Sequence, residues 1–232
     1  MKRQRQVDSL LLYLLKHGQH IDSISFHGDS DRPVKFPQLT PNLQLTSLHF
    51  YKMTLQLQTE EWQHDALVLA VLPLKQLLLD NCVLVGGSKG LTLALSMLPK
   101  LEYLSISRIH RTDRRASSFS LAVLAQLPQL TYLELKKLRL LRPGLDAPFL
   151  QPLQTLTGLV YLHIHLEATS EGFSLGAGML PASHLRYFHL EGDVVLEPGV
   201  QCQDCDRLVL NLAHHLWAAH PYWLHASVSS LS

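Results

Sequence analysis

The sequence predicts an α/β solenoid, in which short parallel strands line a concave face and helices cover the convex face. One observation is a phrase with apolar residues in the pattern L-x-x-L-x-L-x-x-L, clearest as LTYLELKKL at 130–138. Another is that the phrase recurs: counting the copy at 130, copies of differing strength start at 21, 45, 74, 101, 130, 159, 185 and 205, at intervals of 20 to 29 residues. A third is the apolar, helix-like segment that follows most copies and ends at proline or glycine. A period in the twenties indicates repeated strand–helix units.

The alternation within each phrase predicts which side chains are buried. Neighbouring side chains of a strand face opposite sides, so Leu133 and Leu135 should enter the core while Tyr132, Glu134 and Lys136 reach the open face. Eight strands stacked about 4.8 Å apart would form a parallel sheet roughly 34 Å across. Helices are wider than strands, so the array should curve with the sheet on its concave side.

Between the strands, the apolar periodicity and the flanking prolines and glycines predict helices. Their expected ranges are 7–17, 60–72, 88–98, 117–127, 148–157 and 172–180. The chain is thereby divided into an N-terminal capping helix or partial repeat (1–20), a repeat array (21–212) and a C-terminal cap and tail (213–232). In the cap, Leu216 and Trp217 are expected to cover the last strand, because a repeat array must hide its terminal core edge from water.

The repeats resemble the helix-backed leucine-rich repeats of the ribonuclease-inhibitor type and of F-box substrate adaptors, over about residues 20–212. In that family the ninth position of the phrase is usually asparagine or cysteine, which ties down the following turn. Here Cys82 alone matches. The resemblance implies a non-enzymatic module that binds a protein partner on its concave face, including substrate recognition in an F-box-like ubiquitin ligase adaptor. The alternative is a structural or sensor segment of a larger receptor-like protein.

The composition of the chain excludes several classes of protein and partner. The chain is 47% hydrophobic and 17% charged, which suits a leucine-filled array and excludes wholesale disorder. A net charge of +1 does not favour nucleic acid or an anionic membrane as partner. The cysteines number only three, and an odd, small number does not favour a disulfide framework. We therefore expect an intracellular location, in the cytoplasm or the nucleus. No catalytic constellation or cofactor motif is recognisable, so an enzyme is not expected.

One open-face position holds tyrosine in four consecutive phrases, at Tyr103, Tyr132, Tyr161 and Tyr187. Tyrosine offers a large contact area with a polar tip and anchors many protein interfaces. We therefore predict that these residues contact the partner. The alternative is that tyrosine fills a repeat position and stacks on its neighbours.

Beside the tyrosines, the open-face positions bring together Glu134, His163, His165 and His189, which are also predicted to bind the partner. The carboxylates of Glu134 and Glu191 are expected to raise the pKa of the histidines, so that the patch gains charge below about pH 6.5. An ordinary solvated surface is the alternative.

The C-terminal segment contains Cys202, Cys205, His220 and His225, in the spacing C-x2-C-x14-H-x4-H. Zinc fingers have similar ligands with a shorter middle spacer. However, Cys205 takes the first leucine position of the last phrase, where a buried cysteine acts as a small apolar residue. Pro221 also interrupts any helix between the two histidines. We therefore expect a cap without metal, with zinc binding as the weaker alternative.

Overall fold

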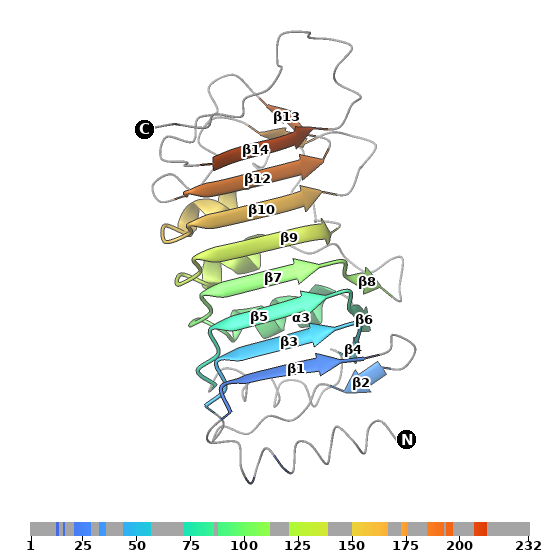
Figure 1. Ribbon diagram of the computed structural model, residues 1–232. Coiled ribbons are helices and arrows are strands. Elements are labelled where there is room, and N and C mark those ends of the chain that lie inside the picture. Colours follow the sequence, from blue (N-terminus) through green and yellow to red (C-terminus); the bar gives the residue numbers. More distant parts are fainter. Residues whose placement is uncertain are drawn as a thin grey trace.

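The dominant feature of the chain is one sheet of eight parallel strands in sequential order, β1-β3-β5-β7-β9-β10-β12-β14 (Figure 1). This fold comes from a computed structural model, which describes residues 13, 16, 21–28, 33–35, 44–56, 72–85, 88–111, 121–138, 150–166, 173–175, 185–192, 194–196 and 207–212. The strands are β1 (Ser23–His27), β3 (Ser47–Tyr51), β5 (Gln76–Asp80), β7 (Tyr103–Ser107), β9 (Tyr132–Leu138), β10 (Tyr161–Leu166), β12 (Tyr187–Gly192) and β14 (Arg207–Leu212). The predicted α/β class with a parallel sheet is confirmed.

Each repeated phrase supplies one strand of this sheet. Neighbouring strands pair so that equivalent positions of their phrases lie opposite one another. The second leucine position illustrates this, with Leu77 opposite Leu104, Leu104 opposite Leu133, and Leu133 opposite Leu162. Leu104, Leu133 and Leu162 are completely buried, as is Leu135 one alternation further along β9. The core therefore lies on the leucine side of the sheet. We call the opposite side, which carries Tyr132 and its equivalents, the tyrosine face.

Short strands that the periodicity did not predict follow several phrases. In Figure 1 they lie at one end of the long strands and form two further parallel sheets. They are β2 (Pro33–Lys35), β4 (Thr54–Gln56), β6 (Val83–Val85), β8 (His110–Arg111), β11 (Phe173–Leu175) and β13 (Val194–Leu196). The helix predicted at 172–180 is wrong over 173–175, because backbone pairing with β13 decides the conformation there.

Helical segments lie behind the sheet in Figure 1, with α3 beside η2 and η2 beside η3. The helix expected at 88–98 is confirmed as α3 (Ser88–Ser96). Of the segments expected at 117–127 and 148–157, the described residues form short 3₁₀ helices, η2 (Leu121–Gln126) and η3 (Gln151–Thr155). Each closes with a tight i→i+3 hydrogen bond, such as Leu127 N–H to the Leu124 carbonyl at 2.9 Å. Pro128 follows, and it has no N–H with which to extend the helix.

Three other predicted segments fall largely outside the described residues. Tyr13 and Lys16 are helical, in agreement with the helix at 7–17. The helix at 60–72 lies outside the described residues except for Leu72, which is in a bend. The C-terminal cap at 213–232 lies wholly outside them. Within the described part of the chain, none of the helices has the length and apolar character needed to cross a lipid bilayer.

A backbone turn also repeats at the ends of four long strands: it follows β3, β5 and β7 and lies at the second-last residue of β9. Lys52, Asn81, Arg108 and Lys137 each have φ between 51° and 54°, in the left-handed region. This conformation costs a non-glycine residue roughly 1–2 kcal/mol. The first three donate their N–H groups to the next strand, to the carbonyls of Asp80, Ser107 and Lys136 respectively, at 2.9–3.0 Å. The units therefore share a hydrogen-bonded turn as well as a leucine pattern.

Cys82 lies directly after one of these turns, fully buried. Its thiol is 3.4 Å from the Phe50 carbonyl oxygen and 3.5 Å from that of Asp80, so it can donate to the backbone at the turn. Burial raises the pKa of the thiol to about 11, with smaller opposing effects from nearby backbone groups. The side chain is thus a protonated donor at neutral pH.

We predict that Cys82 resists thiol reagents in the native protein. At pH 8, a thiol of pKa 11 is ionised in only about one molecule in a thousand, and the reagent needs the thiolate. The measurement is labelling by a disulfide reagent in a Cys202→Ser/Cys205→Ser background. Urea should release one rapidly reacting thiol per chain. Rapid labelling of the folded protein at the urea-unfolded rate would contradict the buried, hydrogen-bonded thiol.

Candidate functional site

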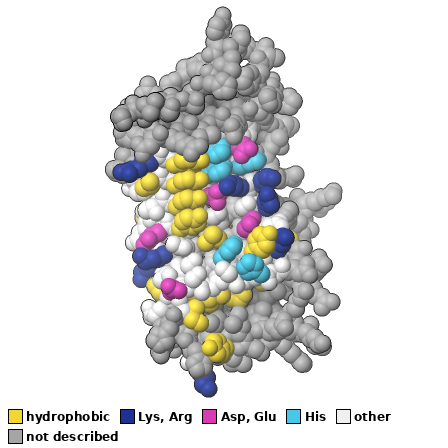
Figure 2. Space-filling model, viewed as in Figure 1, with side chains coloured by type: hydrophobic (Ala, Val, Ile, Leu, Met, Phe, Trp, Pro, Cys, Tyr) yellow, Lys and Arg dark blue, Asp and Glu magenta, His cyan; other side chains and the backbone are white. Residues whose placement is uncertain are grey.

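Four tyrosines form a continuous stack across the tyrosine face, and we call them the tyrosine column: Tyr103, Tyr132, Tyr161 and Tyr187. Each is the first residue of its strand, and neighbours are paired directly in the sheet. Consecutive ring centroids are 4.0, 4.1 and 4.3 Å apart, and the planes differ by 9°, 5° and 2°. Figure 2 shows hydrophobic side chains in one column across the middle of this face.

The sheet imposes this stacking. Directly paired residues on neighbouring strands lie about 4.8 Å apart, so the strand register places the four rings in one row. All four rings are half-buried. Burial is the main cause that raises the pKa of Tyr132 and Tyr161 above the ordinary value. Their hydroxyl groups therefore stay protonated and can donate hydrogen bonds. The column is thus an apolar strip that has neutral hydrogen-bond donors at Tyr132 and Tyr161.

A second group lies beside the column, and we call it the histidine–carboxylate cluster: Glu134, His163, His165, His189 and Glu191. His163 on β10 is paired with Glu134 on β9 and with His189 on β12. The rings of His163 and His189 stack, with centroids 4.1 Å apart and planes 21° apart. Figure 2 shows histidine side chains next to one end of the hydrophobic column. The eight residues predicted to bind a partner thus lie together on one face.

Glu134 is held by two donors that sequence reasoning did not assign to the site. Ser105 donates its hydroxyl to Glu134 at 2.6 Å, and Lys136 forms an ion pair with the other carboxylate oxygen. Burial alone would raise the pKa of Glu134, but the hydrogen bonds from Lys136 and Ser105 outweigh it and leave the pKa below the ordinary value. Glu134 is therefore a fixed negative charge at neutral pH. The register between neighbouring phrases could have identified Ser105, and the alternation within the phrase could have identified Lys136.

The expectation that carboxylates raise the histidine pKa is wrong for His163. This residue is 7% exposed, and burial, reinforced by the positive charge of neighbouring groups, lowers its pKa to about 4. Glu134 acts in the opposite direction, since its carboxylate lies 3.6 Å from His163 Nδ1, but it is outweighed. Loss of hydration penalises the charged imidazole more than this neighbour stabilises it. His163 is consequently neutral throughout the physiological range.

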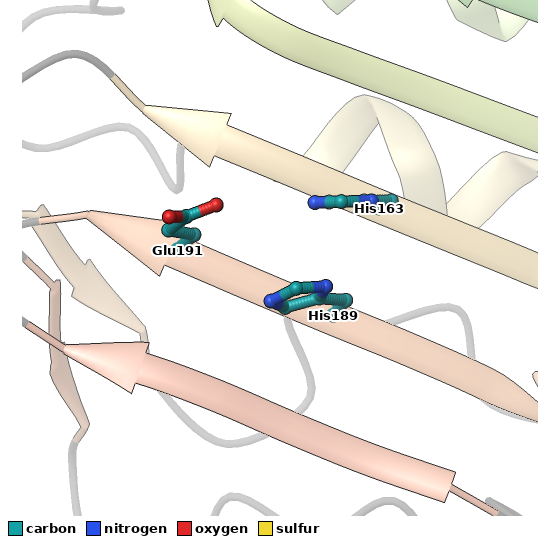
Figure 3. Close-up of side chains that lie close together, drawn as sticks. All are labelled: His163, His189 and Glu191. Carbon is teal, nitrogen blue, oxygen red and sulfur yellow. The ribbon is translucent and has the colours of Figure 1, made fainter.

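The other two histidines have defined contacts. His165 Nδ1 lies 2.8 Å from a carboxylate oxygen of Glu191, and the hydroxyl of Tyr187 lies 3.5 Å from His189 Nδ1. The second contact joins the cluster to the tyrosine column. Figure 3 shows His163 and His189 side by side, with Glu191 further along β12. These three side chains each offer a ligand atom, and the three atoms lie within 4.8 Å of one another.

The predicted alternative zinc ligands cannot be placed, because Cys202, Cys205, His220 and His225 lie outside the described residues.

A smaller aromatic group lies at the other end of the same face. The ring of Tyr51 is 5.5 Å from that of His27 and 6.5 Å from that of His49, and the ammonium group of Lys52 lies 5.1 Å from the Tyr51 centroid. Tyr51 and His49 are half-buried, like the tyrosine column. They provide matched positions for controls on the same face but on β3.

No protein-family model matches the chain, and searches of curated proteins and of solved structures return no significant match.

Proposed function

We propose that the chain is a leucine-rich-repeat solenoid that binds a protein partner on the tyrosine face, without catalysing a reaction. In this proposal the eight-stranded sheet curves and the tyrosine face is its concave side. The repeated left-handed turn, the in-register leucines and the sequential strand order all support a stacked repeat. Such arrays offer extended surfaces to partners. The intracellular location predicted from the cysteines belongs to the same proposal.

The tyrosine column carries the partner-binding part of the proposal. Four half-buried aromatic rings in one strip offer a rigid, apolar surface, and the protonated hydroxyls of Tyr132 and Tyr161 add donors. The ring stack is already ordered, so the tyrosine side chains would lose little conformational entropy when a partner binds. The cluster beside it adds the fixed charge of Glu134 and the polar imidazoles, which favour a partner surface with both apolar and polar groups.

The resemblance to F-box substrate adaptors extends the proposal to substrate recognition in a ubiquitin ligase. In that role, depletion of this protein in cells would raise the abundance of the bound partner. In the alternative role, a structural or sensor segment of a larger receptor-like protein, the tyrosine rings stabilise the sheet by stacking on one another. Depletion would then leave the abundance of any partner unchanged.

We predict that the Tyr132→Ala/Tyr161→Ala variant loses the partner. The experiment captures proteins from a lysate with the immobilised wild-type chain and with the variant, and then measures the Kd of any protein that distinguishes them. A tyrosine at a binding hot spot contributes on the order of 2 kcal/mol, so the Kd should rise about 30-fold or more.

Tyr51→Ala is the matched control, because it removes a half-buried tyrosine of the same face outside the column. Circular dichroism and the melting temperature should show that both variants remain folded. Capture of the same proteins with equal affinity by all three chains would refute concave-face recognition and favour the structural role. The absence of any protein specific to the wild-type chain would have the same meaning.

A further inference from the structure

His163 has a buried nitrogen that the fold does not use. Among the described residues, His163 Nε2 is the one buried side-chain nitrogen or oxygen atom for which no hydrogen-bond partner is found. A buried polar atom without a partner costs roughly 1–3 kcal/mol, so such atoms commonly point to a function. The imidazole is neutral at physiological pH, so one ring nitrogen carries a proton and the other has a lone pair that can bind a ligand.

The surroundings of His163 contain two further groups that can bind a metal ion. His189 is the paired residue on the neighbouring strand, and Glu191 follows it two residues later on the same face. The ligand atoms of the three residues lie within 4.8 Å of one another (Figure 3). We propose that His163, His189 and Glu191 form a binding site for a divalent transition-metal ion, with zinc as the best fit.

The donor set favours zinc over the harder cations. Two imidazoles and one carboxylate suit zinc and its transition-metal neighbours, whereas calcium and magnesium bind mainly oxygen. Zinc lies about 2.1 Å from such ligands, so a tetrahedral site brings the ligand atoms roughly 3.4 Å apart. The rings are now stacked, and rotation of the half-buried His189 and Glu191 side chains would turn their ligand atoms towards a common centre.

Neighbouring carboxylates and imidazoles are placed to support the ligands. Glu134, fixed by Ser105 and Lys136, lies 3.6 Å from His163 Nδ1 and can orient the ring so that Nε2 faces the ion. His165 contacts one oxygen of Glu191 at 2.8 Å, which leaves the second oxygen for the ion. Metal-binding histidines usually have a carboxylate or carbonyl on the other ring nitrogen.

Three protein ligands leave one position of a tetrahedral ion open. His189 and Glu191 are half-exposed, so this position faces solvent on the tyrosine face. Closed structural zinc sites use four protein ligands, whereas an open position allows water or an external ligand to bind the ion. The proposal therefore describes an accessible site.

The test is a zinc titration of the full chain in a Cys202→Ser/Cys205→Ser background, which removes the competing C-terminal cysteines. Calorimetry, or competition with a chromophoric chelator, should show one zinc ion per chain. Zinc should also raise the melting temperature, and EDTA should reverse the rise, because a ligand that binds the native state stabilises it.

Single variants locate the ion. His189→Gln and Glu191→Gln each remove one half-exposed ligand. Mutation of a residue that only supports a ligand commonly weakens metal binding at least about tenfold, so loss of a ligand itself should weaken zinc binding by more than that. His49→Gln is the matched control, because it removes a half-buried histidine of the same face on β3 and should leave the Kd unchanged. Melting in EDTA checks that the variants are folded.

Two outcomes would overturn the site. One is the absence of stoichiometric zinc binding in the cysteine-free background, including the case in which only the chain with both cysteines binds zinc. The other is zinc binding that His189→Gln and Glu191→Gln leave as strong as in His49→Gln.

Discussion

Leu133→Ala is expected to lower the free energy of unfolding by about 3–5 kcal/mol, the range for large-to-small substitutions in a well-packed core. Leu133 is completely buried in the middle of the sheet, between the equally buried Leu104 and Leu162. The neighbouring strands are held in register by backbone hydrogen bonds, so they cannot close the cavity left by the missing methyl groups. The measurement is urea unfolding followed by circular dichroism.

Leu93→Ala is the matched control for this substitution. Leu93 lies in α3 and is 37% exposed, so the same change removes side-chain atoms that already contact solvent. Alanine is also the best helix former, which offsets part of the lost contact. A change of less than about 1 kcal/mol is expected there. Equal destabilisation by the two variants would show that the leucine pattern does not define the core.

Acidification is expected to destabilise the folded chain through His163. The unfolded imidazole binds a proton near pH 6.5, whereas the folded one does so only near pH 4. Between these values the unfolded state binds more protons, so the free energy of unfolding falls as the pH falls from about 6.5 to about 4. Below pH 4 this contribution is lost. The shift corresponds to about 3 kcal/mol at most.

The charges that face His163 come from both neighbouring strands. They are Glu134 and Lys136 on β9, and His189 and Glu191 on β12. Glu134 also titrates on acidification: its pKa is below the ordinary value, so the stability that it contributes is lost as the pH falls through that lower pKa. Comparison with a variant that lacks the His163 imidazole separates the two effects.

The comparison uses the wild-type chain and His163→Gln, both in EDTA, at several pH values from 7.5 to 4. Urea unfolding gives the free energy for each protein, and carboxylates common to both contribute to both curves. The stability advantage of the wild-type chain should shrink by about 3 kcal/mol as the pH falls from 6.5 to 4. A difference that does not change with pH would contradict the low pKa of His163.

The repeated phrase is enough to predict the sheet and the tyrosine column. The repeated phrase places leucine at fixed offsets, and burying those residues leaves a single register in which all strands present the same face. In that register Tyr103, Tyr132, Tyr161 and Tyr187 must lie in a row, because they share one offset from the first leucine of each phrase. The same register predicts which carboxylates lie next to the histidines, and the contact between His165 and Glu191 is an example.

The helix α3 followed from the sequence, but other segments between the long strands took their conformation from tertiary contacts. The segment 173–175 has no alternation long enough to identify a strand, and it becomes one by pairing with 194–196. The helical periodicity at 117–127 and 148–157 predicts buried leucines correctly, yet the described backbone forms 3₁₀ turns. Short segments bury too little to fix their own conformation, so their neighbours in the array determine it.

The protonation of His163 also depended on the tertiary structure. Sequence positions identified Glu134 as a neighbour and so suggested a raised pKa. The His163 ring stacks on His189 and is only 7% exposed, although it lies on the same side of the sheet as the half-exposed tyrosines. The loss of hydration then exceeds the attraction of the carboxylate and lowers the pKa. Which charges are close follows from strand register, whereas the dielectric around them follows from how the side chains pack.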